Sequence, residues 1–528
     1  MRDFQLPGRS PVRAMDAMVA TSHPLASAAA LTLLREGGNA IDAAICASAV
    51  LAVVEPQSTG IGGDCFCLYV RGGEGPVLAY NGAGRAPEAA TIDWYEERGF
   101  TEIPVDSPHA VTIPGAIDAW CRLSADHGCT PLERVLAPAI HYAEAGYVIH
   151  DRVEADWHEA RDLLAQDATA ARIFLPGGAV PRAGDVHRQP ELARSLRLIA
   201  AKGRAVFYQG ELAEDLVAHL RSRGGLHTLD DFAAAGGDYA EPVRTSYRGI
   251  DVWQMPPSNQ GLTALLMLNL LAGFDLAGLD PLGAERLHLE VEAGRLAYRI
   301  RDELIADPDH ADVPVEALLA SSYADGLRRR INPDMANREL PEAVMEPSDT
   351  VYLSVVDRDR NAVSFINSTY HSFGSGLVGP KSGIVLQNRG RGFRVDRRHP
   401  NCIAPRKRPL HTIMPGMATR NGRVVAPFGV MGGDYQPFGN VHVLSNLLDY
   451  GMDPQAAIDL PRVFYEKGEL LAERGVPAAT LRALEARGHK VGPAGEPLGG
   501  GQMVLIDWDR GTLTGGSDPR KDGLAIGY

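Results

Sequence analysis

The sequence predicts a layered α/β fold of the α+β kind, because strand and helix signals are mixed without a regular βαβ repeat. Two alanine-rich apolar segments near the N-terminus, residues 25–35 and 40–54, predict helices. A strand signal at residues 247–253 is followed by an apolar helix signal at residues 261–271. The β-branched and aromatic run at residues 351–356 predicts a buried strand.

Boundary residues support the two N-terminal helices. The first helix is expected to stop at Gly37-Gly38, and Asn39 is suited to cap the second, since its side chain can accept hydrogen bonds from free backbone N–H groups. The second segment contains Asp42 and ends at Glu55-Pro56, so it is too short and too polar to span a bilayer.

Two further elements follow in the middle of the chain. The strand at 247–253 is expected to end before Pro256-Pro257, where the chain must leave a sheet. A long helix is then predicted before Asp307-Pro308, because apolar residues at intervals of seven, four and four form one stripe: Leu289, Leu296, Ile300 and Leu304.

Length and composition are those of a large globular protein with a sizeable core. Of the 528 residues, 45% are hydrophobic, and 52 basic against 66 acidic side chains leave a formal charge of −14. This charge disfavours nucleic acid and anionic membrane surfaces as partners. Six cysteines without CxxC spacing favour reduced thiols over disulfides or zinc. The N-terminus has no apolar signal-peptide region, so we expect a cytoplasmic protein.

The most informative residue is Thr350, which stands between a polar segment and the strand at 351–356. Residues 332–349 contain three prolines and no sustained apolar period, which predicts an exposed connection. A cut before Thr350 would make it a new N-terminus. An α-amine with an unperturbed pKa of roughly 7.7–8.0 could then accept the proton of the threonine hydroxyl. Without further evidence, an ordinary threonine at the start of a strand is the better interpretation of Thr350.

The sequence around Thr350 resembles the start of the small subunit of the γ-glutamyltranspeptidase family, in residues 350–357, 361–364, 373–376 and 383–388. Residues 37–44 and 60–63 are similar to that family's large-subunit signature. Shorter matches follow in order along the chain: Pro114-Gly115, Met255-Pro256-Pro257, Arg408-Pro409-Leu410, Gly432-Gly433 and Ser517-Asp518-Pro519-Arg520.

The resemblance implies a four-layer αββα sandwich of the N-terminal nucleophile hydrolase type. It also implies autocatalytic cleavage between Asp349 and Thr350, which would give a large subunit of residues 1–349 and a small subunit of residues 350–528 that form one folded unit. No metal or organic cofactor is implied. A dimer of this two-subunit unit is a further expectation.

Three more catalytic positions are implied by the same resemblance. Gly432 and Gly433 would supply the backbone N–H groups of the oxyanion hole, although a Gly-Gly pair is more commonly a plain turn. Ser368 stands where the family has a threonine that hydrogen-bonds the nucleophile. A solvent-facing strand serine is the alternative interpretation of Ser368.

The substrate-binding positions depart from the family pattern. The arginine that grips the γ-glutamyl carboxylate is replaced by Ala83, with Arg85 two residues later. The acidic residue that holds the substrate ammonium falls on Gly392. The remaining replacements are Arg389 for a glutamine, Tyr370 for an asparagine and His411-Thr412 for a pair of serines.

The gain of a guanidinium and the loss of a carboxylate should favour a substrate with a simple anionic group over a substrate with a zwitterionic amino-acid group. In the alternative interpretation, Arg85 and Arg389 pair with structural carboxylates and His411 is a buried imidazole with its hydrogen bonds satisfied.

These replacements are similar to those of the cytoplasmic branch of the family that includes oxamate amidohydrolase. Oxamate is a small carboxylate that bears an amide and no ammonium, so the expected activity is hydrolysis of oxamate to oxalate and ammonia. The first alternative is a γ-glutamyl hydrolase or transferase acting on glutathione-like amides, with Arg85 holding the carboxylate. A cephalosporin-type acylase is more distant. In a different class, a precursor that never matures would be a single-chain binding protein.

Overall fold

The computed structural model of the chain describes residues 5, 8–338, 340, 345 and 350–528. Both predicted N-terminal helices are confirmed, as α1 (Pro24–Arg35) and α2 (Ala40–Val54). Asn39 caps α2 through hydrogen bonds from the backbone N–H groups of Ile41 and Asp42, and the Asp42 side chain accepts in return from Asn39 N–H. Every residue of α2 is buried, which fits its nearly uniform apolar sequence.

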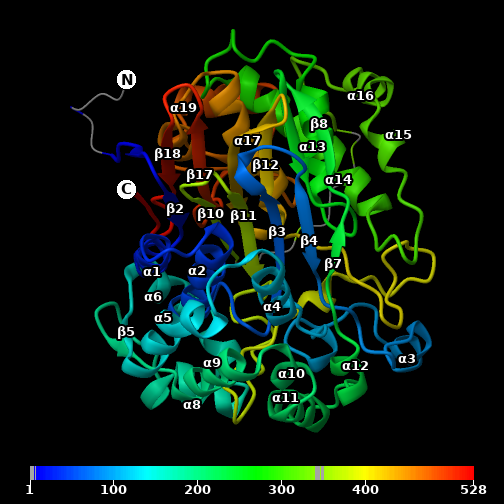
Figure 1. The fold of residues 1–528 in the computed structure, drawn as a ribbon. Coiled ribbons are helices and arrows are strands. Elements are labelled where there is room, and N and C mark those ends of the chain that lie inside the picture. The colour runs from blue at the N-terminus through cyan, green and yellow to red at the C-terminus, as the bar shows by residue number, and fades with distance from the viewer. Residues whose placement is uncertain (1–4, 6–7, 339, 341–344, 346–349) are drawn as a thin grey trace.

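Two antiparallel sheets of seven strands each form the centre of the molecule (Figure 1). The first sheet has the order β19 (Leu524–Gly527), β2 (Met18–Thr21), β10 (Val351–Val356), β11 (Ala362–Ser368), β3 (Asp64–Val70), β4 (Leu78–Gly82) and β7 (Asp238–Ala240). The second has the order β1 (Val12–Ala14), β18 (Thr512–Ser517), β17 (Gly500–Asp507), β13 (Arg423–Met431), β12 (Gly416–Arg420), β9 (Ile250–Gln254) and β8 (Val243–Tyr247).

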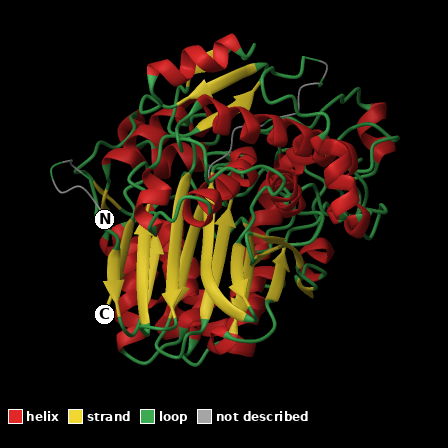
Figure 2. Cartoon of the chain, turned by 90° about the horizontal axis from the view of Figure 1, so that it is seen from above, coloured by secondary structure: helices red, strands yellow, loops and turns green. Residues whose placement is uncertain are grey.

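The two sheets pack face to face, and helices cover the outer face of each (Figure 2). On the first sheet these are α1, α2 and α4 (Ala116–His127), with α5 (Leu132–Ala145) and α9 (Pro190–Lys202) behind α2. On the second sheet they are α13 (Gly261–Leu271), α17 (Gln436–Leu448) and α18 (Pro454–Asp459), with α14 (Ala284–Leu304) packed on α13 and α17. The predicted four-layer αββα sandwich is therefore confirmed.

Smaller elements complete the chain. The remaining α-helices of the described residues are α3 (Ile92–Glu97), α6 (Asp151–Glu159), α7 (Arg161–Leu164), α8 (Ala168–Phe174), α10 (Arg204–Tyr208), α11 (Glu211–Ser222), α12 (Leu229–Ala233), α15 (Val315–Leu319), α16 (Ser321–Arg328) and α19 (Ala478–Ala486). Two small sheets pair β5 (Tyr147–Val148) with β6 (Val186–His187), and β14 (Val463–Glu466) with β15 (Glu469–Ala472) and β16 (Val491–Pro493). Within the described residues, no helix is both long enough and apolar enough to cross a bilayer.

The core between the sheets is built by alternate residues of facing strands, among them Phe66, Ile366, Met417 and Val504. Period-two alternation puts the other residues of the first sheet, such as Val351 and Leu353, under α2. The predicted strand at 351–356 is confirmed with its exact bounds.

The predicted strand at residues 247–253 is wrong in one respect. The chain makes a hairpin there, because β8 ends at Tyr247 and β9 begins at Ile250. Arg248 and Gly249 connect them with φ of 52° and 76°. Two consecutive positive φ values give the turn a twist that matches the twist of the paired strands.

Candidate active site

Thr350 immediately precedes β10, a strand in the interior of the first sheet. In the antiparallel pair of β10 and β11, Val351 lies opposite Asn367, so the start of one strand meets the end of the other. This brings Thr350 Oγ1 to 3.1 Å from Ser368 Oγ. Both side chains are fully buried. Asp349, on the other side of the predicted cut, lies outside the described residues.

Ser368 links the threonine to the predicted substrate-binding residues. Its Oγ accepts a hydrogen bond from Tyr370 N–H at 2.9 Å and one from Arg389 Nη2 at 3.4 Å. Tyr370 has a φ of 82°, and the carbon at the centre of the Arg389 guanidinium lies 4.0 Å from the centroid of its ring. A cation over an aromatic face at this distance is attracted by the electrons of the ring.

Arg389 is a buried cation that, among the described residues, has no carboxylate within ion-pair distance, although Asp64 and Asp434 attract it from farther away. Its exposed fraction is 0%, its Nη1 donates to Thr412 Oγ1 at 2.7 Å, and its Nε is buried without a hydrogen-bond partner. In the described part of the chain, no carboxylate forms an ion pair with it. Burial lowers the pKa of Arg389 to about 10, so the side chain remains charged at neutral pH. An unpaired buried charge is costly, and an anionic ligand would relieve that cost.

Gly432 and Gly433 form a tight turn where β13 ends. Their φ values of 117° and 55° lie in the left-handed region, where glycine is favoured. A side chain on Gly432 would place its Cβ only 3.0 Å from Gly499 Cα. The carbonyl of Gly433 accepts from Gln260 Nε2 at 2.9 Å, and the same nitrogen donates to Thr412 O at 2.7 Å. Gln260 therefore ties the glycine turn to the residue that contacts Arg389.

A cavity of about 520 Å³ adjoins this turn. Gly432, Asp434 and His371 are among the residues that line it. The Asp434 carboxylate is held by Arg301 Nη1 at 2.6 Å, and Arg301 also donates to Gln260 Oε1 at 3.0 Å. Thr350, Ser368 and Arg389 are not among the residues that line this cavity. The role of Gly432 and Gly433 as oxyanion donors therefore stays a prediction.

His411 is paired with a residue that the sequence did not point to. Its Nε2 lies 3.0 Å from Asp64 Oδ2, and both side chains are fully buried. Burial, and then the positive charge of Arg389, lower the pKa of His411 to about 3, so the imidazole is neutral. The Asp64 Oδ1 atom accepts three further hydrogen bonds, from Gly84 N, Gly115 N and Gln387 Nε2. The alternative interpretation of His411 as a satisfied buried imidazole fits this geometry.

Arg85 lies apart from the threonine cluster. Its Nη2 donates to Asp309 Oδ2 at 3.0 Å and its Nη1 to Arg406 O at 3.0 Å. It lines a separate cavity of about 200 Å³ together with Pro114. The arrangement matches the alternative in which Arg85 pairs with structural carboxylates. Among the predicted substrate residues, the structure groups Tyr370, Arg389 and Thr412 around Ser368 and Thr350.

Acid should destabilise the protein in part through His411. In the unfolded chain this imidazole takes up a proton near pH 6.5, whereas in the folded protein it resists protonation down to about pH 3. The unfolded state therefore binds more protons in this window, and stability must fall as the pH falls. The contribution of one such group is about 1.4 kcal/mol per pH unit.

Urea unfolding between pH 7 and pH 4 measures how the free energy of unfolding changes with pH. The Thr350→Ala variant is used because, without the nucleophile, it should remain a single uncut chain. We expect His411→Gln, in the same precursor, to lose less stability on acidification than its parent. Equal slopes for the two proteins would contradict the assignment of a depressed pKa to His411.

Comparison with known proteins places this geometry in a family. The model of the gamma-glutamyltranspeptidase family matches residues 26–528. The chain is 40% identical to the Glutathione hydrolase-like YwrD proenzyme of Bacillus subtilis, over 97% of this chain and 98% of the relative. It is 36% identical to the Oxamate amidohydrolase proenzyme of Klebsiella pneumoniae, over 97% and 98%.

Among solved structures, the cephalosporin acylase from Bacillus halodurans superimposes with a TM-score of 0.94 at 40% identity, covering 100% of this chain and 99% of that one. These relatives match the chain almost from end to end, and several are named as proenzymes. The chain therefore belongs to the γ-glutamyltranspeptidase family and is an autoprocessing hydrolase that acts on amide bonds, made as one precursor and processed into two subunits.

Proposed function

We propose that this enzyme hydrolyses oxamate to oxalate and ammonia, with Thr350 as an N-terminal nucleophile. The observation that carries the proposal is the buried guanidinium of Arg389 beside the nucleophile, which forms no direct ion pair with a described carboxylate. Only two contacts, of 3.4 and 3.1 Å, separate Arg389 Nη2 from Thr350 Oγ1 by way of Ser368 Oγ. A substrate that binds Arg389 through its carboxylate must therefore carry its amide close to that carboxylate.

Substrate length distinguishes the two leading candidates. In oxamate the amide carbon is bonded directly to the carboxylate carbon. In a γ-glutamyl amide three carbon atoms stand between the corresponding groups, and an ammonium is attached to one of them. The short distance from Arg389 to Thr350 favours oxamate. Among the described residues, no carboxylate lies within ion-pair distance of Arg389. A substrate ammonium placed there would lose its hydration without gaining a direct ion pair.

In the proposed mechanism, cleavage between Asp349 and Thr350 frees the α-amine of Thr350, which accepts the hydroxyl proton as Oγ1 attacks the amide carbon. The N–H groups of Gly432 and Gly433 stabilise the oxyanion, and Arg389 holds the substrate carboxylate. The α-ammonium returns its proton to the departing nitrogen as the C–N bond breaks. The amine then deprotonates a water molecule, which attacks the oxalyl ester. The resulting α-ammonium returns this proton to Oγ1 as the ester C–O bond breaks and oxalate is released.

The two proposed subunits would remain one folded unit. Strands β10 and β11 belong to residues 350–528, but they lie between β2 and β3 of residues 1–349 in the same sheet. Cleavage before Thr350 would leave these backbone hydrogen bonds in place. A cytoplasmic location and a dimer of the two-subunit unit remain predictions from the sequence.

A γ-glutamyl hydrolase is the second candidate, favoured by the 40% identity to a protein named Glutathione hydrolase-like. Ammonia release from oxamate, compared with product release from a γ-glutamyl anilide, separates the two. We expect turnover of oxamate and a steep loss of rate when one or two methylene groups are inserted between carboxylate and amide, as in malonamate and succinamate. Turnover of the anilide alone would exclude the oxamate proposal.

A further inference from the structure

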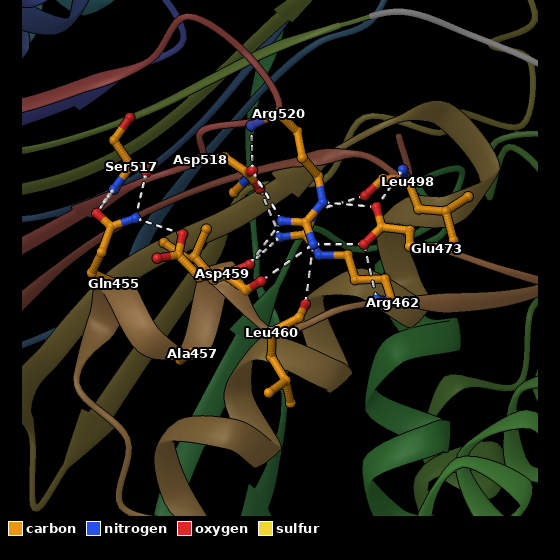
Figure 3. Close-up of polar contacts among 12 residues, drawn as sticks. Gln455, Ala457, Asp459, Leu460, Arg462, Glu473, Leu498, Ser517, Asp518 and Arg520 are labelled. Atoms are coloured by element: carbon orange, nitrogen blue, oxygen red, sulfur yellow. Dashed lines mark hydrogen bonds and ion pairs between the residues drawn. The ribbon is translucent and has the colours of Figure 1, made fainter. Parts of the chain in front are cut away.

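A buried network of two arginines and two acids joins the C-terminal motif to the hairpin of β14 and β15 (Figure 3). Arg462 Nη2 donates to Asp518 Oδ2 at 2.7 Å, and Arg520 Nη1 donates to Asp518 Oδ1 at 3.1 Å. Arg520 also makes a forked pair with Glu473, at 2.6 and 2.7 Å. None of the four side chains is more than 12% exposed.

Two members of the network bind the backbone of Leu498, which lies in the connection that leads into β17. Glu473 Oε1 accepts from Leu498 N–H at 3.0 Å, and Arg462 Nη1 donates to Leu498 O at 2.6 Å. Both polar groups of the Leu498 backbone are thus held by charged side chains. Asp518 adds a third attachment, since its Oδ2 accepts from Gly501 N–H at 2.7 Å. Figure 3 shows Glu473 and Leu498 side by side.

The segment held in this way packs directly on the glycine turn. A Cβ on Gly499 would lie 2.5 Å from Met431 O, and a Cβ on Gly432 would lie 3.0 Å from Gly499 Cα. Gly500 pairs with Met431 in the ladder of β17 and β13. Because these backbone segments are in direct contact, a shift of Leu498 would displace Gly499 against Gly432.

Stability alone is a weak reason to keep four ionised groups buried around one peptide. Taking charges out of water costs several kcal/mol per ion, and apolar replacements are often neutral or stabilising. A network that fixes the position of a backbone segment has a different use, because transition-state stabilisation requires donors that are already aimed before the reaction.

We propose that Glu473 and Arg462 are positioning residues, which act through Leu498 and Gly499 to keep the N–H groups of the Gly432 turn aimed at the developing oxyanion. The inference rests on the proposed role of that turn. It does not depend on which amide is the substrate, since every amide forms an oxyanion when Thr350 attacks it.

The test uses the mature enzyme and whichever amide the wild type turns over, oxamate or the γ-glutamyl anilide. Glu473→Gln removes the charge that holds Leu498 N–H, and Arg462→Lys removes the nitrogen that donates to Leu498 O. We expect each variant to lower kcat about 10- to 100-fold, a fraction of the loss for a missing oxyanion donor, with KM changed less than threefold. Assays are run at least 15 °C below the Tm of each variant.

Glu469→Gln is the matched control, because Glu469 begins β15, which ends just before Glu473, but pairs with the exposed Lys490. It should leave kcat within twofold of the wild-type value. The inference is overturned if Glu473→Gln and Arg462→Lys keep wild-type kcat while only their Tm falls, or if KM rises at constant kcat. If one variant does not fold, the other decides the outcome. A wild type that rejects oxamate but accepts the anilide refutes the substrate proposal alone.

Discussion

Thr350→Ala should leave the precursor as one chain and lower amide hydrolysis by about 10⁴-fold or more, since the substitution removes the nucleophile for both reactions. The alanine methyl group is smaller than the threonine side chain it replaces in this fully buried site, and the substitution removes the contact of Oγ1 with Ser368 Oγ. The protein should therefore fold normally. A denaturing gel follows the cleavage, and ammonia release from oxamate follows the activity.

Thr350→Ser is the control for this experiment, because it keeps a hydroxyl at the same position. It should be cut, if more slowly, and should retain measurable turnover. N-terminal sequencing of the smaller fragment should begin at residue 350. An uncut Thr350→Ala protein with wild-type turnover would rule out the N-terminal nucleophile mechanism, and a wild type that stays uncut while active would do the same.

Arg389→Met should lower kcat/KM for oxamate by about 10²–10³-fold, the usual consequence of removing one partner of a buried charged pair. Methionine keeps much of the side-chain volume against Tyr370 but cannot bind a carboxylate. Arg389→Lys should recover part of the loss, because an ammonium keeps the charge and lacks the guanidinium fork. Steady-state kinetics with oxamate measures both.

Arg391→Met serves as the matched control two residues away. Arg391 binds Glu102 and the carbonyl of Ile103 on a partly exposed surface, so its loss should change kcat/KM less than threefold. A hydrolysable amide without a carboxylate provides a second check, since it should be indifferent to Arg389→Met. Equal losses for the charged and uncharged amides would mean that Arg389 shapes the site without binding the anion.

Much of the fold could be predicted because its signals are local. The strand at 351–356 and the helix at 261–271 have the predicted bounds, since each is a continuous apolar run with a clear boundary. The hairpin at Arg248-Gly249 was missed because its flanking residues all favour strands. Its one local sign was Gly249, and a glycine inside a strand pattern often marks a turn or a bulge.

Candidate site residues could be located in the sequence only where a motif marked them. Thr350, Ser368 and the glycine pair stand at positions that a resemblance can locate. Asp64 directly follows the matched residues 60–63 and Gln260 follows Ser258-Asn259, but no local pattern indicates a role for either side chain. Arg85 and Arg389 are chemically the same in the sequence. Only the structure distinguishes them. Arg85 pairs with Asp309, which lies more than 200 residues away in the sequence, whereas Arg389 is buried without forming an ion pair with a described carboxylate.

The interleaving of β10 and β11 between β2 and β3 has a consequence for recovery after denaturation. Before cleavage, these strands find their neighbours within one polymer, and the rate of renaturation is independent of protein concentration. Once the chain is cut, two separate polypeptides must collide before the central sheet can be completed, so renaturation becomes second order and slows on dilution. Cleavage would therefore make refolding of the denatured protein inefficient in dilute solution, whereas refolding of the uncut precursor does not depend on concentration.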